Sequence, residues 1–346
     1  MGKKINVGII GLGKVGLLRK TLIQKHPFLH LQAVCDITKP DVSAMAGCRY
    51  FERYQDLLDA DIDAVFVATP NRFTPEIVIA ALNHHKHVFC EKPPGRTVKD
   101  IELIRAAEKT SNGCVLKFGF NHRYHGAVME AKKIIDSGIY GRILWIRGVY
   151  GKSGGLNFTK EWRSNRESSG GGILLDQGIH MLDLFRYFLG NFSEIKSFVN
   201  TSYWDIDVED NAFALMRNKN NQVAFIHSSS TQWKHTFNME IGLEGGYVNI
   251  HGILSSTRSY GQGERLVVAK KQFEDETQAL GNPRESITFF DRDRSWELEI
   301  EEFVNCIEKH MPVSQGTSTD ALEVMKLVHD IYNNDRPKSI AGNRGL

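Results

Sequence analysis

The sequence predicts an α/β protein with two domains, in which a doubly wound parallel sheet is followed by a second α/β domain with a large, open and mainly antiparallel sheet. Up to residue 120, short β-branched runs alternate with helical stretches, as in parallel sheets with helical crossovers. After residue 124, polar and apolar residues alternate over longer segments rich in aromatic side chains, which is typical of antiparallel strands. The length of 346 residues also fits two domains of about 150 residues each.

The first half of the chain contains short, almost continuously apolar runs, as expected for strands that are covered on both faces. Strands are predicted at 5–10, 31–35, 64–69, 87–90 and 115–120. A helical run follows the first strand and ends at Pro27, and further helices are predicted at 75–83 and 98–109. We expect the domain boundary near residue 122, which gives domains 1–122 and 123–340.

The second half opens with a helical stretch that ends at Ser137. Strands are predicted at 143–150, 195–203, 211–216, 223–228, 237–243 and 247–251. Amphipathic helices are predicted at 295–309 and 319–333, where they can pack back on the first domain, whereas 341–346 carries no pattern. Because few helices accompany so many strands, one face of the sheet should stay open to a partner, and we expect a homodimer or homotetramer.

The composition argues against several classes of protein. Lys and Arg number 43 and Asp and Glu 41, so the net charge of +2 gives no overall field that would hold nucleic acid or an anionic membrane. The longest charge-free apolar runs are far shorter than the roughly 18 residues of a membrane span. The five cysteines are dispersed without a C-x-x-C pair, which favours free thiols in the cytoplasm over a disulfide framework or a structural metal site.

A glycine-rich loop directly follows the first predicted strand and precedes the first helix. Its residues are Gly11, Leu12, Gly13, Lys14, Val15 and Gly16, which match the pattern G-x-G-x-x-G. The glycines allow a tight turn and close approach to a pyrophosphate at the positive end of the helix. Asp36 lies about 20 residues further on, where a carboxylate accepts hydrogen bonds from ribose hydroxyls and repels a 2′-phosphate. The loop therefore predicts a dinucleotide, NAD by preference, with NADP as the alternative because Lys39 is close in sequence.

Two polar segments carry the candidate catalytic residues. Lys92 follows a predicted strand at its carboxyl end, where open α/β sheets hold ligands and an ammonium can stabilise an alkoxide. In a helix that begins near residue 174, Asp176, His180, Asp183 and Tyr187 share one face. His180 can take a hydroxyl proton during hydride transfer, with Asp176 orienting its ring. The alternatives are a His–Asp pair that only packs, or a metal site, which the lack of a further histidine at ligand spacing disfavours.

Basic residues ahead of this helix indicate how a substrate is held. Lys152, Lys160, Arg163 and Arg166 lie near Tyr150 and Trp162 in the sequence. Arg163 and Arg166 can clamp a carboxylate or phosphate and Trp162 can stack on a sugar or base, so we expect an anionic or highly polar substrate. The alternative is a solvated charged loop. We expect His122 and His125 to be surface or junction residues rather than ligands.

Taken together, these segments resemble the Gfo/Idh/MocA oxidoreductases, the family of glucose-fructose oxidoreductase and inositol dehydrogenase. The similarity extends over nearly the whole chain and rests on the glycine loop, A-T-P-N at 68–71, E-K-P at 91–93, N-H-R-Y at 121–124, and the glycine triplet at 170–172 that leads to Asp176 and His180. It implies a Rossmann domain, then an α/β domain, with the active site between them. It also implies hydride transfer to or from a hydroxyl or carbonyl of a sugar, sugar nucleotide or cyclitol.

The resemblance implies roles for single residues. Lys92, Asp176 and His180 are implied as the catalytic group. Thr69, Pro70, Asn71, Glu91, Lys92 and Asn121 are implied to lie near the cofactor, and Arg123, Tyr150, Trp162 and Arg163 complete the expected substrate contacts. Thr74 stands where many members carry a histidine, so the cofactor contacts there are in doubt. Two alternatives stay open: an NAD-dependent glycosidase of the same fold, and a non-catalytic regulatory protein that binds the cofactor.

Overall fold

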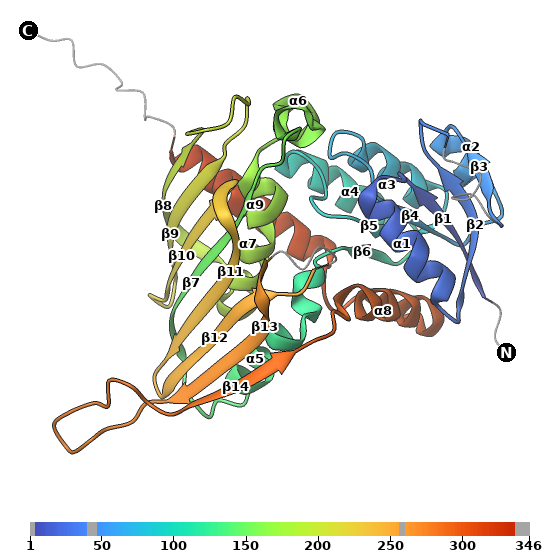
Figure 1. The fold of residues 1–346 in the computed structure, drawn as a ribbon. Helices are drawn as coiled ribbons and strands as arrows, with labels where there is room; N and C mark the ends of the chain where they lie inside the picture. Colours follow the sequence, from blue (N-terminus) through green and yellow to red (C-terminus); the bar gives the residue numbers. More distant parts are fainter. Residues whose placement is uncertain (1–3, 40–46, 256–259, 336–346) are drawn as a thin grey trace, which may run out of the picture.

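The structure is a computed structural model that describes residues 4–39, 47–255 and 260–335. It contains a six-stranded and an eight-stranded sheet, with helices packed between them and on their faces (Figure 1). The first sheet is parallel and the second is mainly antiparallel, which confirms the predicted fold class. The segment 341–346 and the last residues of the expected second domain lie outside the described residues.

The first sheet has the strand order β3-β2-β1-β4-β5-β6. Its strands are β1 (Ile5–Ile10), β2 (Leu29–Cys35), β3 (Arg49–Phe51), β4 (Ala64–Val67), β5 (His87–Cys90) and β6 (Leu116–Phe118), and its helices are α1 (Lys14–Lys25), α2 (Tyr54–Leu58), α3 (Thr74–Asn83) and α4 (Val98–Thr110). This order is that of doubly wound dinucleotide-binding sheets, in which the connections diverge between β1 and β4 and leave a crevice at the carboxyl ends of the strands.

The second sheet has the strand order β14-β13-β12-β11-β7-β10-β9-β8. Its strands are β7 (Ile143–Ser153), β8 (Phe192–Asn200), β9 (Asn211–Asn218), β10 (Val223–Ser229), β11 (Thr231–Leu243), β12 (Gly246–Ile253), β13 (Tyr260–Lys270) and β14 (Glu285–Phe290). The accompanying helices are η2 (Asn121–Tyr124), α5 (Gly126–Asp136), η3 (Phe158–Lys160), η4 (Trp162–Ser164), α6 (Arg166–Ser169), η5 (Leu174–Gly178), α7 (Ile179–Leu189), α8 (Ser295–Lys309) and α9 (Ser318–Asn334).

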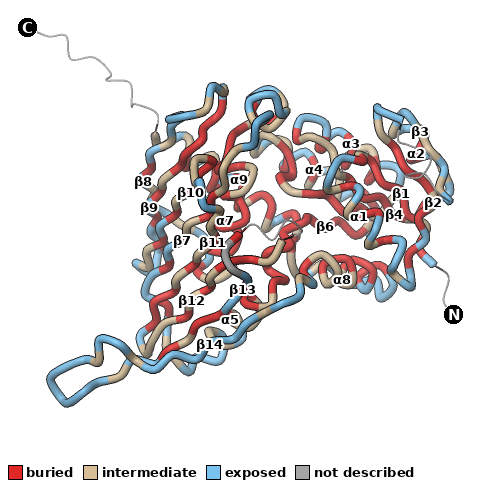
Figure 2. The backbone as a smooth tube through the Cα atoms, in the orientation of Figure 1, coloured by how far each residue is buried: buried red, intermediate tan, exposed pale blue. Residues whose placement is uncertain are grey.

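The hydrophobic core connects the two sheets. One buried cluster runs from α3 and α4 through α9 and α7 to the inner face of the second sheet. A second cluster lies on the opposite face of the first sheet, where α1 and α8 cover β1, β4 and β5. In this cluster Phe303 of α8 meets Phe66 and Phe89 edge to face, each with ring centroids 5.6 Å apart. The late helix α8 therefore completes the core of the first sheet, as its place beneath that sheet shows (Figure 2).

Three local features differ from the sequence prediction. The strands β3, β13 and β14 were not expected, and β14 lies at the sheet edge with most of its residues exposed, so no apolar face marks it in the sequence. The strands β7 and β10 pair in parallel rather than antiparallel. The helix predicted from residue 174 begins with the wider π-turn η5, and regular α-helix starts only at Ile179.

Candidate active site

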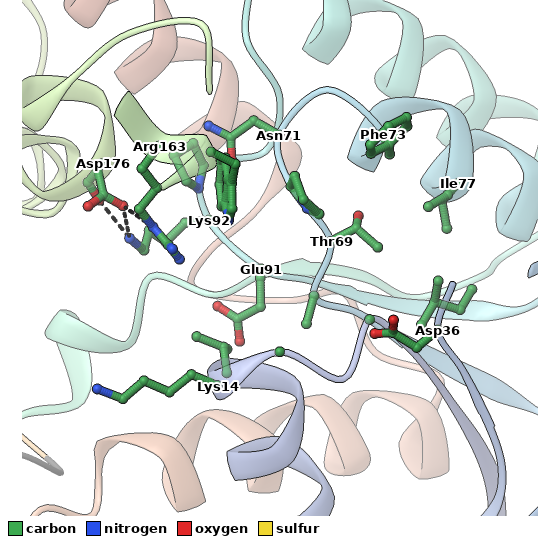
Figure 3. A pocket seen from close by; sticks show the side chains of 18 of the residues that line it. Lys14, Asp36, Thr69, Asn71, Phe73, Ile77, Glu91, Lys92, Arg163 and Asp176 are labelled. Atoms are coloured by element: carbon green, nitrogen blue, oxygen red, sulfur yellow. Dashed lines mark hydrogen bonds and ion pairs between the residues drawn. The ribbon is translucent and has the colours of Figure 1, made fainter. Parts of the chain in front are cut away.

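A cleft of about 890 Å³ begins at the carboxyl ends of the first sheet and ends against the second domain (Figure 3). The predicted site residues that line it are Gly11, Gly13, Lys14, Val15, Asp36, Thr69, Pro70, Asn71, Glu91, Lys92, Asn121, Tyr150, Trp162, Arg163, Asp176 and His180. Leu12, Gly16 and Arg123 do not line it. The structure thus brings these predicted residues together in one cleft, although they are far apart in the chain.

The glycine loop has the geometry that a pyrophosphate requires. Gly11 has a φ of +92°, and a Cβ on Gly16 would lie 1.9 Å from the Gly11 carbonyl oxygen, so both positions demand glycine. A Cβ on Gly13 would meet no atom within 4 Å, because this residue faces the open cleft. No side chain caps the N-terminus of α1, and its first turn has no acidic residue. The free amides and the positive helix end therefore suit a bound anion.

Asp36 follows β2 and lies beside the glycine loop. One of its carboxylate oxygens accepts a hydrogen bond from the Leu12 amide at 2.6 Å and the other from the Thr38 amide at 2.9 Å. Both bonds fix the carboxylate at the cleft wall, and each oxygen keeps a lone pair for a further donor. The geometry thus suits ribose hydroxyls, although the Thr38 contact is also the one expected of a simple turn cap. Near this region the Thr74 hydroxyl lies 3.1 Å from that of Thr69, at the position where many family members carry a histidine.

Three cations surround the carboxylate of Asp176. The Nζ atom of Lys92 donates to the Asp176 backbone carbonyl at 2.6 Å and lies 3.8 Å from its carboxylate. Lys152 and Arg163 approach the same carboxylate at 3.2 and 3.3 Å. Figure 3 shows Lys92 and Arg163 beside Asp176. These cations hold the pKa of Asp176 well below its usual range, against the opposing effect of burial. Burial, reinforced by Arg163 and Lys152, lowers the pKa of Lys92. Lys152 was noted in the sequence but not counted among the expected site residues.

His180 is not oriented by Asp176, contrary to the sequence prediction. Its ring stacks on that of His122, with centroids 3.7 Å apart, and its Nδ1 has no hydrogen-bond partner among the described residues. Burial, and then the charge of Lys92, lower the pKa of His180 well below its usual value. The ring is therefore neutral near pH 7 and able to accept a proton.

His122 and His125 are buried and line the cleft between the two domains, so of the two expected places the surface is wrong and the junction is the one observed. The ring nitrogens of His122 contact the Asn121 side-chain oxygen and the Tyr150 hydroxyl, both at 3.1 Å. The sequence signal that could have identified His122 is its place in the segment N-H-R-Y at 121–124, on which the family resemblance rests. The Nδ1 atom of His125 lies 2.7 Å from Glu264.

Arg123 is buried away from the cleft, so the structure does not support it as a substrate contact. Its guanidinium forms two hydrogen bonds to Asp183, at 2.8 and 2.6 Å, and an ion pair with Asp320 at 3.1 Å. Tyr187 lies beneath the same guanidinium. Asp183 and Tyr187 therefore belong to a structural cluster with Arg123 and, unlike His180, do not line the cleft.

Glu91, next to Lys92, is held by an ion-pair network that the sequence did not reveal. Arg19 of α1 donates to Glu91 at 2.6 Å and to Glu299 of α8 at 2.6 Å. The Arg19 guanidinium lies between the rings of Phe89 and Trp296 and is fully buried. The network ties the end of β5, where Lys92 begins, to helices from both ends of the chain.

The glycine loop, the crossover of the first sheet and the cleft together define a dinucleotide-binding Rossmann protein with a second domain that closes the site. Comparison with known proteins narrows this class. Residues 5–120 match the family described as oxidoreductase family, NAD-binding Rossmann fold, and residues 128–249 match the GFO/IDH/MocA C-terminal domain. The chain belongs to the Gfo/Idh/MocA family of NAD-binding oxidoreductases.

Several curated relatives are dehydrogenases of sugars. Levoglucosan dehydrogenase of Pseudarthrobacter phenanthrenivorans is 35% identical over 214 residues, which cover 58% of this chain and 55% of that protein. D-Glucoside 3-dehydrogenase of Escherichia coli is 30% identical over 256 residues, which cover 65% of this chain and 70% of that protein. The aligned part thus spans little more than half of the first relative. The crystallised levoglucosan dehydrogenase in complex with NADH shares the fold, with a TM-score of 0.83 at 24% identity over 96% of this chain and 97% of that one.

The described residues contain neither a membrane-spanning helix nor a cluster of metal-ligating side chains. No helix there is long and apolar enough to cross a membrane. Within the same ranges, no group of three or more His, Cys, Asp or Glu side chains is arranged to hold a metal ion.

Proposed function

We propose that this protein transfers hydride between NAD and a hydroxyl or carbonyl of a sugar, sugar nucleotide or cyclitol. The observation that carries the proposal is the joint position of Lys92 and His180 on the wall of the cleft that begins at the glycine loop. Lys92 is a cation and His180 is a neutral base, and carbinol oxidation requires both kinds of group. The sugar dehydrogenases among the relatives support this class of substrate.

Each residue has a separate task in this reaction. NAD, when bound, supplies the hydride acceptor, and the glycine loop, Asp36, Thr69 and Asn71 would hold it. The His180 imidazole takes the hydroxyl proton and returns it in the reverse direction, because its lowered pKa keeps it unprotonated at neutral pH. The Lys92 ammonium stabilises the negative charge that develops on the substrate oxygen.

The test is turnover of a panel of sugars, sugar phosphates, sugar nucleotides and cyclitols, followed through nicotinamide absorbance. His180→Ala and Lys92→Ala should each lower turnover by roughly 10²-fold or more while the affinity for NAD changes little. Lys99→Ala, at an exposed lysine in α4, is the matched control and should behave as the unmodified protein. If no substrate is turned over and NAD binds, the regulatory alternative replaces this proposal. If glycosides are cleaved with NAD tightly bound and no net redox change, the glycosidase alternative replaces it.

The outer face of the second sheet supports assembly into a homodimer or homotetramer. Leu215 and Phe225 are exposed and pair across β9 and β10, and Phe198 and Trp145 are exposed on the neighbouring strands. Exposed apolar side chains in such numbers mark surfaces that partners cover. Sedimentation at micromolar concentration should show an oligomer, and a monomer would contradict this assignment. None of the five cysteines is in a disulfide, which supports a location in the cytoplasm.

A further inference from the structure

The charges around Asp176 do not balance. Lys92, Lys152 and Arg163 all lie within 4 Å of this single carboxylate, at 3.8, 3.2 and 3.3 Å. All four side chains are partly or largely shielded from solvent, with the Asp176 side chain 18% exposed. The cluster therefore carries two positive charges that no carboxylate within it compensates.

Other buried carboxylates already have partners of their own. Glu91 is paired with Arg19 at 2.6 Å and Asp183 with Arg123 at 2.6 Å, and Glu264 lies 2.7 Å from the His125 ring. Burial lowers the pKa of both His122 and His180, so these rings are neutral and leave the excess of two positive charges unchanged. A positive nicotinamide ring, which NAD carries in its oxidised form, would increase the excess further.

Arg163 has hydrogen-bond donors left over at the cleft. Its Nε is the only guanidinium nitrogen with an acceptor among the described residues, at the long distance of 3.3 Å from Asp176. The guanidinium lies over the Trp162 ring, 4.4 Å from the centroid, which fixes its plane while both Nη atoms stay unpaired. Lys152 is not among the lining residues of the cleft, but its side chain is 21% exposed, and Asp176 is its only acceptor in the described part of the chain, which leaves two of its three protons. Figure 3 shows Arg163, Asp176 and Lys92 gathered at one end of the cleft.

We propose that the substrate carries an anionic group, a carboxylate or a phosphate, which binds between Arg163 and Lys152. Two parallel Nη donors match the two oxygens of a carboxylate or two oxygens of a phosphate. The Lys152 ammonium adds a point charge, and Trp162 supplies an apolar surface for a face of the sugar ring. Lys92 then remains at Asp176 beside His180 for the chemical step. This inference rests on the proposed hydride transfer and names its substrate class as anionic sugars.

The test compares matched substrates that differ in one group: glucose, glucuronate and glucose 6-phosphate, each with NAD. Turnover gives kcat/KM, and isothermal titration of each sugar into the NAD-loaded protein gives the binding constant. We expect at least one anionic sugar to bind about 10- to 100-fold more tightly than glucose, which is the scale of charge-assisted hydrogen bonds. The advantage should fall as salt is added, because a half-exposed ion pair is screened. Comparing the binding constants of glucuronate and glucose 6-phosphate shows whether the site prefers a carboxylate or a phosphate.

Arg163→Gln and Lys152→Gln should each reduce the advantage of the anion while the affinity for glucose changes less. Lys160→Gln, at an exposed residue of the same loop, is the control and should leave the advantage intact. Equal kcat/KM for glucose and both anions would overturn the proposal and leave hydride transfer standing. An equal loss for neutral and anionic sugars in Arg163→Gln would also overturn it, since Arg163 would then only hold Asp176. Turnover of no compound in the wider panel of sugars, sugar phosphates, sugar nucleotides and cyclitols would refute the proposed function itself.

Discussion

Replacing Arg19 by methionine tests how the end of β5 is held. Methionine fills a similar volume but removes the charge, so Glu91 and Glu299 would lose the cation that each contacts at 2.6 Å. Both carboxylates are largely shielded from solvent, and Glu299 is completely buried. Breaking a buried pair by removing one partner costs about 3–5 kcal/mol, because the remaining charge is left without compensation.

The expected change in unfolding temperature follows from this energy. With an unfolding entropy of about 2.1 cal/mol/K per residue, a loss of 3–5 kcal/mol in a chain of this length lowers the midpoint by roughly 4–7 °C. The deficit should depend on pH. Burial raises the pKa of Glu299 to about 7, so this carboxyl binds its proton more tightly in the folded protein than in the unfolded chain. Its contribution to stability is therefore present at low pH and lost as the pH rises through 7, and the deficit of Arg19→Met should shrink toward pH 5.

Differential scanning fluorimetry at several pH values measures both effects. The matched control is Arg142→Met, since Arg142 contacts Glu244 at a similar distance, 2.7 Å, but at the exposed surface. An exposed pair contributes about 0–1 kcal/mol, so this variant should lose little. The unfolding temperature of Arg19→Lys should lie between those of the two methionine variants, because its ammonium replaces part of the network. If Arg19→Met loses no more than Arg142→Met, the buried network does not stabilise this region. If it loses the same amount at pH 5 and pH 8, protonation of Glu299 does not set the size of the loss.

The other predictions concern the cofactor and the base. Asp36→Ala should weaken the preference for NAD over NADP, measured as binding constants for both, and an unchanged ratio would rule out the carboxylate as the selector. Gly16→Ala should lower the unfolding temperature, because its Cβ would lie 1.9 Å from a backbone oxygen, whereas Gly13→Ala should unfold as the unmodified protein and bind NAD less well. The rising limb of oxidation against pH should lie below pH 6.5, since burial and Lys92 lower the pKa of His180, and it should disappear in His180→Ala. A limb that persists in that variant would assign the proton transfer to another group.

The parts of the fold that the sequence predicted well are those with strong apolar signals. The ranges 5–10, 87–90 and 295–309 agree with β1, β5 and α8 at both ends, because each is bounded by polar or turn residues. The strand β3 has only three residues, and none of them is buried, so periodicity could not detect it. Parallel pairing of β7 with β10 depends on how the whole sheet is assembled, which no local pattern encodes.

Site residues were predicted correctly where a sequence motif fixes their position. They were predicted wrongly where contacts between distant parts of the chain fix it. The glycine loop and Lys92 follow strands, so their place at the sheet edge was evident. The expected contact between Asp176 and His180 was wrong, because Lys92, Lys152 and Arg163 from other elements engage the Asp176 carboxylate and the His180 ring stacks on His122. Arg123 was expected at the substrate, but a carboxylate 60 residues away in sequence binds it inside the protein. No local pattern could indicate that partner.

The position of α8 has a consequence for synthesis of the protein. The strands of the first sheet emerge early from the ribosome, yet the rings of Phe66 and Phe89 gain their cover only when Phe303 has been made. At about 5–20 residues per second, the delay between β6 and α8 is roughly 10–35 s. During that interval the nascent nucleotide-binding sheet presents an apolar face to the cell, and chaperones that recognise such surfaces have time to bind it. Its folding is therefore expected to finish after translation of nearly the whole chain.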